Sequence, residues 1–214
     1  MRSFVLLLCL STQCSALGAA ELSINVRTVD DQAMPNAVVY LLPKQPSTQT
    51  STTEIAIMDQ INRQFSPHIL VVQKGSQIRF PNSDSIKHHV YSFSSAKTFE
   101  LQLYRGLDAN PLLFDKTGLV ELGCNIHDWM LGFVLVVDTP YFAKTDLTGK
   151  AHFTVTEGDY TVKIWHPRIA KDSVNIEQEI VVSEDNSMLF TLDKPLRPDL
   201  NQYEAVPTDV SDYD

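Results

Sequence analysis

The residues that could do metal chemistry are concentrated in one short segment and one upstream pair. Cys124, His127 and Met130 follow one another at three-residue spacing, and two adjacent histidines, His88 and His89, precede them. A thiolate, two imidazoles and a weak thioether suit copper in both oxidation states, whereas zinc favours four strong ligands and calcium or magnesium favours oxygen. Such a site needs little rearrangement when an electron moves, so its natural use is electron transfer.

Strands must position these donors, because the chain is typical of an all-β protein. After residue 20, short runs of β-forming residues are broken by turn residues about every ten positions, without an amphipathic helix longer than two turns. The apolar run 131–137 is too short to span a membrane and is predicted to be a buried strand. We expect strands at Leu22–Arg27, Ala37–Leu42, Ile69–Gln73, Gln77–Pro81, His89–Phe93, Phe99–Tyr104, Gly118–Leu122, Gly132–Asp138, His152–Thr156, Asp159–Trp165, Ile176–Ser183 and Met188–Leu192.

Residues 62–138 resemble the cupredoxins, the small blue copper proteins, and within them amicyanin and the plastocyanin-like proteins labelled methylamine utilization proteins. The resemblance rests on Phe65-x-Pro67, Gly75-x-x-Ile78-x-Phe80-x-Asn82, the His89-Val90 pair and Cys124-x2-His127-x2-Met130. It implies a Greek-key β-sandwich that binds one type 1 copper ion. The ligands that it implies are His88, Cys124, His127 and Met130.

The first histidine departs from the family pattern. In that pattern the ligand lies six residues after an Asn, is usually preceded by Pro, and is followed by Asn. Here Asn82 is followed six residues later by His88, with Lys87 in place of the Pro and His89 in place of the Asn. Because adjacent strand residues point to opposite faces, only one of the two histidines can face the metal. The resemblance favours His88, and His89 remains the alternative ligand.

Support for the ligands is expected from three sources. Backbone N–H groups are expected to bond the Cys124 sulfur, and Asn82 is expected to bridge to the Cys124 strand. A hydrophobic cover of Trp129, Phe133 and Phe93 is expected to keep water off the copper. The resemblance further implies that His127 is the ligand nearest solvent, where electrons enter or leave.

The segments on either side of the cupredoxin-like region have a different character. Residues 30–40, 145–153 and 156–162 resemble pieces of one small transthyretin-like or carboxypeptidase-regulatory-like β-sandwich, with a D-x-x-G turn and a G-x-Y-x-V strand; generic hairpins are the alternative. The 214 residues suffice for two small β domains. We therefore expect a discontinuous sandwich of residues 21–45 plus 141–192, a polar linker at 44–54, a cupredoxin domain at 55–140, and a disordered acidic tail at 193–214.

The N-terminus predicts export. Arg2, the apolar run Phe4–Leu10 and the small residues up to Ala20 are typical of a signal peptide, residues 1–20, cleaved near Ala20. The apolar run is too short to cross a bilayer, so we expect a periplasmic protein that does not span the membrane. Cys9 and Cys14 leave with the signal, and Cys124 then has no partner for an internal disulfide.

The charge balance limits the possible partners. The chain has 17 basic and 26 acidic residues and a formal charge of −9, which argues against nucleic-acid binding. Cleavage of the signal removes Arg2 and leaves 16 basic against 26 acidic residues, a charge of −10. We expect a basic or apolar-patched redox partner, such as a c-type cytochrome or a dehydrogenase. The sequence leaves the oligomeric state open.

Other functions are less well supported. Copper handling is the alternative to electron transfer, but Met34, Met58, Met130 and Met188 are not clustered. An enzyme is not expected. Multicopper oxidases place histidines on both sides of the ligand cysteine, whereas Gly123 and Asn125 flank Cys124 here, and the G-x-S-x-G elbow of a hydrolase is absent from the sequence. A purely structural, metal-free role is the remaining alternative. Three further histidines are not part of any metal-ligand spacing motif and are predicted to be structural or exposed: His68, His152 and His166.

Overall fold

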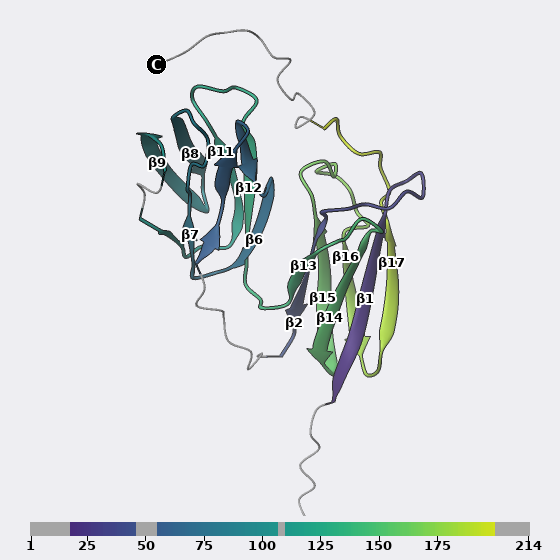
Figure 1. Ribbon diagram of the computed structural model, residues 1–214. Coiled ribbons are helices and arrows are strands. Elements are labelled where there is room, and N and C mark those ends of the chain that lie inside the picture. The colour runs from purple at the N-terminus through teal and green to yellow at the C-terminus, as the bar shows by residue number, and fades with distance from the viewer. Residues whose placement is uncertain (1–17, 46–54, 107–109, 200–214) are drawn as a thin grey trace, which may run out of the picture.

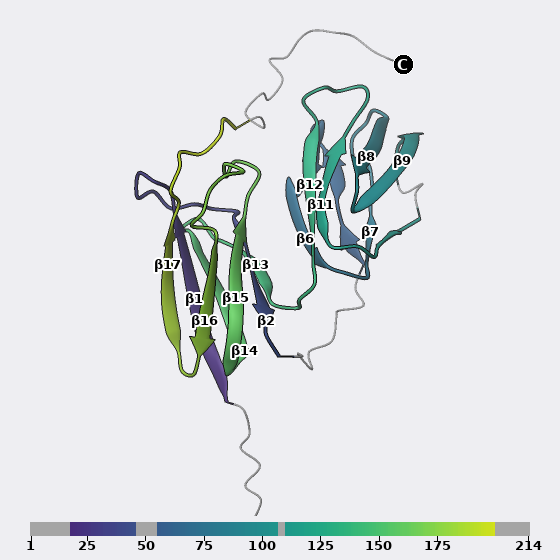
Figure 2. The ribbon, with the colours of Figure 1, turned by 180° about the vertical axis from the view of Figure 1, so that it is seen from behind.

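The computed structural model of the protein describes residues 18–45, 55–106 and 110–199. These residues form strands β1 to β17 and no helix, which confirms the prediction of an all-β protein. Within them, accordingly, there is no helix long and apolar enough to cross a membrane. The strands build two β-sandwiches that lie side by side (Figure 1 and Figure 2). The predicted signal peptide up to residue 17 and most of the predicted linker lie outside the described residues.

Strands from both ends of the described chain form one sandwich, which we call the terminal sandwich. Its strands are β1 (Ala19–Arg27), β2 (Val38–Pro43), β13 (Phe142–Lys144), β14 (Lys150–Thr156), β15 (Gly158–Trp165), β16 (Glu177–Val182) and β17 (Asn186–Thr191). One sheet has the order β14-β1-β17 and the other β13-β2-β15-β16. Alternate residues of β1, such as Leu22 and Ile24, are buried between the two sheets, as expected for strands with one face on a core.

The middle of the chain forms the central sandwich. Its strands are β3 (Ala56–Ile57), β4 (Asp59–Ile61), β5 (Gln64–Ser66), β6 (Ile69–Gln73), β7 (Ser76–Arg79), β8 (His88–Ser94), β9 (Lys97–Tyr104), β10 (Leu112–Phe114), β11 (Gly118–Gly123) and β12 (Leu131–Val137). A sheet of order β6-β12-β11-β8-β9 encloses an aromatic core with the sheet β10-β7-β3, and β4-β5 is a separate hairpin. Phe80 and Phe114 are the largest side chains fully buried in this core.

Strand β12 is buried on both faces, which explains its uninterrupted apolar sequence. Val134 and Val136 point into the core of the central sandwich. Phe133, Leu135 and Val137 point the other way and pack in a third hydrophobic cluster, which includes Val38 and is flanked by partly buried residues of β2, β13 and β15. The prediction of a buried strand at 131–137 is confirmed.

The two sandwiches support a division into domains. The strands of the terminal sandwich fall at 19–43 and 142–191, and those of the central sandwich fall at 56–137. We propose that residues 21–45 plus 141–192 and residues 55–140 form two domains, the second inserted into the first. The likeness of the terminal sandwich to transthyretin-like domains stays a prediction.

The D-x-x-G turn of the terminal sandwich is held by its own side chain. Asp146 Oδ1 accepts bonds from the backbone N–H groups of Thr148 (2.8 Å) and Lys150 (3.0 Å). Gly149 has a φ of 80°, and a Cβ there would lie 2.6 Å from the Val26 carbonyl oxygen. Only glycine combines this backbone conformation with this close approach.

Thr145 joins the turn that precedes β2 to the strand β13. Its buried hydroxyl accepts a bond from the Ala37 N–H (2.9 Å) and donates to the Met34 carbonyl (2.6 Å). In Thr145→Val both backbone groups lose their partner, so we expect the free energy of unfolding to fall by about 1–3 kcal/mol in urea titrations followed by circular dichroism. Thr154→Val, which removes an exposed bond to Glu21, is the control, with a loss within about 0.5 kcal/mol. Equal losses would contradict the role of Thr145.

The segment after β17 differs from the prediction of a disordered tail. Residues 193–199 pack back on the terminal sandwich: the Arg197 N–H donates to the Arg168 carbonyl (2.7 Å), and Arg168 Nε donates to the Arg197 carbonyl (2.9 Å). Leu196 lies against the core of that sandwich. The prediction of disorder rested on the polar composition of the tail, and composition does not reveal bonds made by backbone groups. Residues 200–214 lie outside the described part of the chain.

Candidate metal centre

Three of the four predicted ligands meet at one end of the central sandwich. His88 begins β8, Cys124 follows β11, and His127 lies on the loop before β12. The Cys124 Sγ lies 3.9 Å from Nδ1 of His88 and 3.9 Å from Nδ1 of His127, and all three ligand atoms lie within 4.8 Å of one another. A sulfur and a nitrogen bound to one ion at about 2.3 and 2.0 Å, at a trigonal angle, lie about 3.7 Å apart. The donor set therefore fits a single metal ion with little movement.

The fourth predicted ligand, Met130, lies on the same loop. Its side chain belongs to the hydrophobic cluster that contains Cys124, and its backbone N–H donates to the His127 carbonyl (2.9 Å). His88, Cys124 and Met130 are buried, with exposed fractions of 0%, 4% and 2%, whereas His127 is partly exposed. As the resemblance implies, His127 is the most solvent-accessible of the four. Ligation by Met130 stays a prediction.

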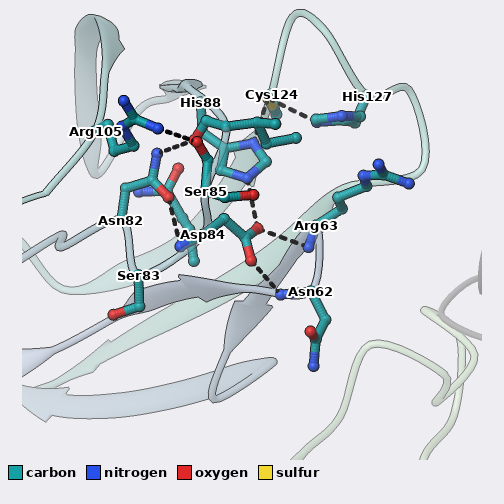
Figure 3. A network of polar contacts seen from close by, with 12 residues as sticks. Asn62, Arg63, Asn82, Ser83, Asp84, Ser85, His88, Arg105, Cys124 and His127 are labelled. Atoms are coloured by element: carbon teal, nitrogen blue, oxygen red, sulfur yellow. Dashed lines mark hydrogen bonds and ion pairs between the residues drawn. The ribbon is translucent and has the colours of Figure 1, made fainter. Parts of the chain in front are cut away.

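A carboxylate orients the ring of His88. Asp84 Oδ2 lies 2.7 Å from Nε2 of His88, so the other ring nitrogen, Nδ1, faces Cys124 (Figure 3). The same carboxylate accepts the backbone N–H groups of Asn62 (2.7 Å) and Arg63 (2.8 Å). Burial alone would raise the pKa of Asp84, but the bonds from Arg63, His88 and Asn62 outweigh it and hold the pKa below its usual value. A carboxylate that fixes the tautomer of a histidine is a common support of metal ligands.

The Asn62-Arg63 turn that serves Asp84 has an unusual backbone. Both residues have positive φ, 55° and 57°, in the two-residue connection between β4 and β5. This is the geometry of a type I′ hairpin turn, which glycine or asparagine usually supplies. It aims two adjacent N–H groups at one carboxylate, as Figure 3 shows.

The Cys124 thiol lies in surroundings that favour the thiolate. Burial raises its pKa, but bonds from the His88 ring and from the backbone N–H groups of His89 and Ile126 more than offset this, so the pKa lies below the usual value. Backbone support of the sulfur was expected from the sequence. Since the thiolate is the form that binds metals, the site is prepared for a soft cation.

His127 is held in the neutral form that a metal ligand requires. Burial, followed by the positive charges of His88 and Arg63, lowers the pKa of His127 to about 4. Its ring lies 4.9 Å from that of His88, centroid to centroid.

His89 points away from the three donors. Its Nε2 lies 2.8 Å from the Glu100 carboxylate on β9, and the pairing of β8 with β9 shifts register between His88 and Val90. The structure thus brings His88, and not His89, to Cys124 and His127. The alternation of side chains along a strand anticipates that only one of the two histidines reaches the donors.

Asn82 plays a different part from the one expected. Its Nδ2 donates to the carbonyls of Ile86 (2.9 Å) and Tyr104 (2.8 Å), and its Oδ1 accepts the Asp84 N–H (3.0 Å). Both amide hydrogens are thus used, so the expected bridge from Asn82 to the Cys124 strand is wrong. Asn82 instead ties the segment that carries Asp84 and His88 to the end of β9.

The expected hydrophobic cover is also only partly correct. Trp129 lies against His127 with ring centroids 5.2 Å apart. Phe93 is 82% exposed at the far end of β8, and Phe133 packs between the two sandwiches against Trp165. Phe93 and Phe133 lie on strands β8 and β12, and the side of the sheet to which each side chain points depends on how those strands pair.

The structure shows that two residues not predicted from the sequence, Asp84 and Glu100, contact the histidines of the site. Asp84 orients His88 and Glu100 holds His89. The one sequence signal for Asp84 was a carboxylate four residues before a ligand histidine. Of the remaining histidines, His152 is exposed, while His68 and His166 are partly buried beside the contact between the two sandwiches.

The known proteins that this chain is similar to are solved structures. No family model and no curated protein matches this chain. Among solved structures, a Cu-containing nitrite reductase from Thermus scotoductus matches at 18% identity and a TM-score of 0.39, over 45% of this chain and 25% of that one; the match thus spans a quarter of its length. A purple cupredoxin from Nitrosopumilus maritimus matches at 23% identity and a TM-score of 0.35, over 38% of this chain and 99% of that one. An amicyanin variant with Cu(I) matches at 20% identity and a TM-score of 0.35, over 39% and 82%. The structural neighbours are thus cupredoxins.

Proposed function

We propose that this chain is an exported type 1 copper protein that transfers single electrons between periplasmic redox partners. The observation that carries the proposal is the buried Cys124 Sγ with two imidazole Nδ1 atoms at 3.9 Å. Copper bound there would supply a one-electron couple at a site acceptable to Cu(I) and Cu(II). His88, Cys124, His127 and Met130 are the residues proposed to hold it.

The chain's own residues hold the donors of this site in place. Asp84 fixes the His88 ring, backbone N–H groups bond the sulfur, and β11, one of the two strands that flank the ligand loop, pairs along its whole length with the other, β12. Rigid donors reduce the reorganisation that accompanies electron transfer, and they slow metal exchange. This favours an electron carrier over a copper-delivery protein.

Electrons are proposed to enter and leave through His127, the partly exposed ligand. The charge of −10 on the mature chain favours a basic partner, such as a c-type cytochrome or a dehydrogenase, through electrostatic steering. Electron exchange with a basic cytochrome should then slow as ionic strength rises. A rate independent of salt would contradict steering.

The decisive test is spectroscopic. The chain from Glu21 onward is loaded with one equivalent of Cu(II), and its visible and EPR spectra are compared with those of Cys124→Ala, His88→Ala and His89→Ala. We expect an intense blue thiolate-to-copper band with narrow hyperfine splitting, lost in Cys124→Ala and His88→Ala and kept in His89→Ala, the matched control. A pale, ordinary Cu(II) spectrum in the parent protein would overturn the proposal and favour copper handling.

A further inference from the structure

A cleft lies between the two sandwiches. It encloses about 650 Å³ and is lined by the central sandwich, by the terminal sandwich and by the segment 197–199. The metal centre is elsewhere: His88, Cys124 and His127 do not line this cleft. Nothing in the proposed electron transfer uses it.

One wall of the cleft is aromatic. Phe133 packs edge-on against Trp165 with ring centroids 5.8 Å apart, and against His68 at 5.2 Å. The His68 ring is held in place by its Nδ1, which lies 3.0 Å from the Leu131 carbonyl. Flat, apolar and fixed side chains of this kind suit a planar apolar group.

The remaining wall is strongly positive, although the protein as a whole is acidic. Lys144, Arg168, Lys171 and Arg197 line the cleft against two acids, Glu121 and Asp199. Among the described residues, only Arg168 of these four cations forms an ion pair, with Asp199 at 3.4 Å. The cleft therefore holds more cationic groups than its own carboxylates neutralise.

Lys144 is the most informative of these cations. Its Nζ crosses between the sandwiches and donates to the Ile69 carbonyl (3.1 Å), and no carboxylate within the described ranges pairs with it. Burial lowers its pKa. A half-buried ammonium without a counter-charge is unfavourable, and an anion in the cleft would offset that cost.

The cleft already receives one carboxylate from the chain itself. Asp199 reaches Arg168 from the segment that follows the last strand. This contact shows that the positive wall is accessible to a carboxylate. It also suggests that a ligand would compete with, or lie beside, the Asp199 side chain.

We propose that the cleft between the two sandwiches binds a small organic anion, a carboxylate carried on a flat aromatic body. The aromatic body lies against Phe133 and Trp165, and the carboxylate faces Lys144 and Arg168. An inorganic anion would leave the aromatic wall unused, and a neutral aromatic would leave Lys144 uncompensated.

The test uses Trp165 as the reporter. The chain has two tryptophans, so Trp129→Phe leaves Trp165 as the only one. The copper-free protein is titrated with benzoate, benzamide and benzamidine, which share a shape and differ in charge. We expect benzoate to change Trp165 fluorescence saturably, benzamide to bind about tenfold more weakly, and benzamidine to bind more weakly still.

Substitutions in the same background locate the site. Lys144→Met and Arg168→Gln should each weaken benzoate binding about tenfold, while Lys163→Met, which removes an ion-paired lysine outside the cleft, should leave it unchanged. Equal binding of the three probes, no saturable response to benzoate, or unchanged binding in both Lys144→Met and Arg168→Gln would overturn the proposal. The copper-free readout keeps this result separate from that of the proposed function.

Discussion

Replacing Asp84 with asparagine is expected to weaken Cu(II) binding about ten- to hundredfold. The substitution changes one atom of the side chain, and it leaves Cys124, His127 and Met130 untouched. Its effect arises from the position of one proton on His88.

The physical reason is the tautomer of the His88 ring. The Asp84 carboxylate accepts a bond from Nε2 of His88 at 2.7 Å, so Nε2 keeps its proton when a metal ion displaces the proton on Nδ1, and Nδ1 is the nitrogen that binds the metal. The Asp84 carboxylate accepts three bonds, from the His88 ring and from the Asn62 and Arg63 N–H groups. An asparagine cannot accept all three, because its amide nitrogen is a donor. If that nitrogen takes the place of Oδ2, it opposes the Arg63 N–H and favours the His88 tautomer with its proton on Nδ1, which blocks the metal. If it takes the place of Oδ1, it opposes the Asn62 N–H and disturbs the turn.

Metal titration with the blue band as readout measures the effect. The matched control is Glu100→Gln, since Glu100 lies 2.8 Å from Nε2 of His89, a histidine that points away from the donors. We expect Glu100→Gln to bind copper like the parent. Equal losses in Asp84→Asn and Glu100→Gln, or no loss in either, would show that Asp84 does not position His88.

Much of the fold could be predicted from the sequence, because the longer strands show either alternating apolar and polar residues or an uninterrupted run of apolar residues. Each of the predicted strands overlaps an observed one, and the run 131–137 was recognised as buried. Five observed strands were not predicted: β3, β4, β5, β10 and β13. Each has two or three residues, too few to show a period of two. The β4–β5 hairpin was further hidden because its turn is Asn62-Arg63, without the glycine that usually marks such a turn.

The candidate site, too, could be predicted from the sequence only in part. Cys124, His127 and Met130 are close in sequence, so spacing alone indicates their joint chemistry. Strand alternation predicted that only one of His88 and His89 would face the other donors, and the six-residue spacing from Asn82, part of the resemblance, favoured His88. The partners Asp84, Glu100 and Asn82 depend on how β8 pairs with β9 and how a hairpin reaches the ligand segment. Such contacts between distant segments leave no periodic signal in a single sequence.

Gly132→Ala is expected to lower the free energy of unfolding by about 1–3 kcal/mol, or somewhat more. A Cβ on Gly132 would lie 2.8 Å from both Cβ and Cγ of Phe65, closer than real side-chain carbons approach. Phe65 is 2% exposed and cannot rotate its own Cβ away. The whole strand β5 would therefore have to move off β12. That movement would also displace the Asn62-Arg63 turn that holds Asp84, so we expect weaker copper binding in the same variant.

Gly123→Ala is the matched control. A Cβ at Gly123 would lie equally close to its neighbour, but that neighbour is the end of a side chain and not the atoms next to a backbone. It would lie 2.7 Å from Cζ and Oη of Tyr91, the far end of a partly exposed side chain that can shift. Urea unfolding should show a smaller loss for Gly123→Ala than for Gly132→Ala. A double-mutant cycle of Gly132→Ala with Phe65→Ala should give a combined loss below the sum of the two single losses, because removal of the ring relieves part of the overlap. Strict additivity would contradict contact with Phe65 as the cause.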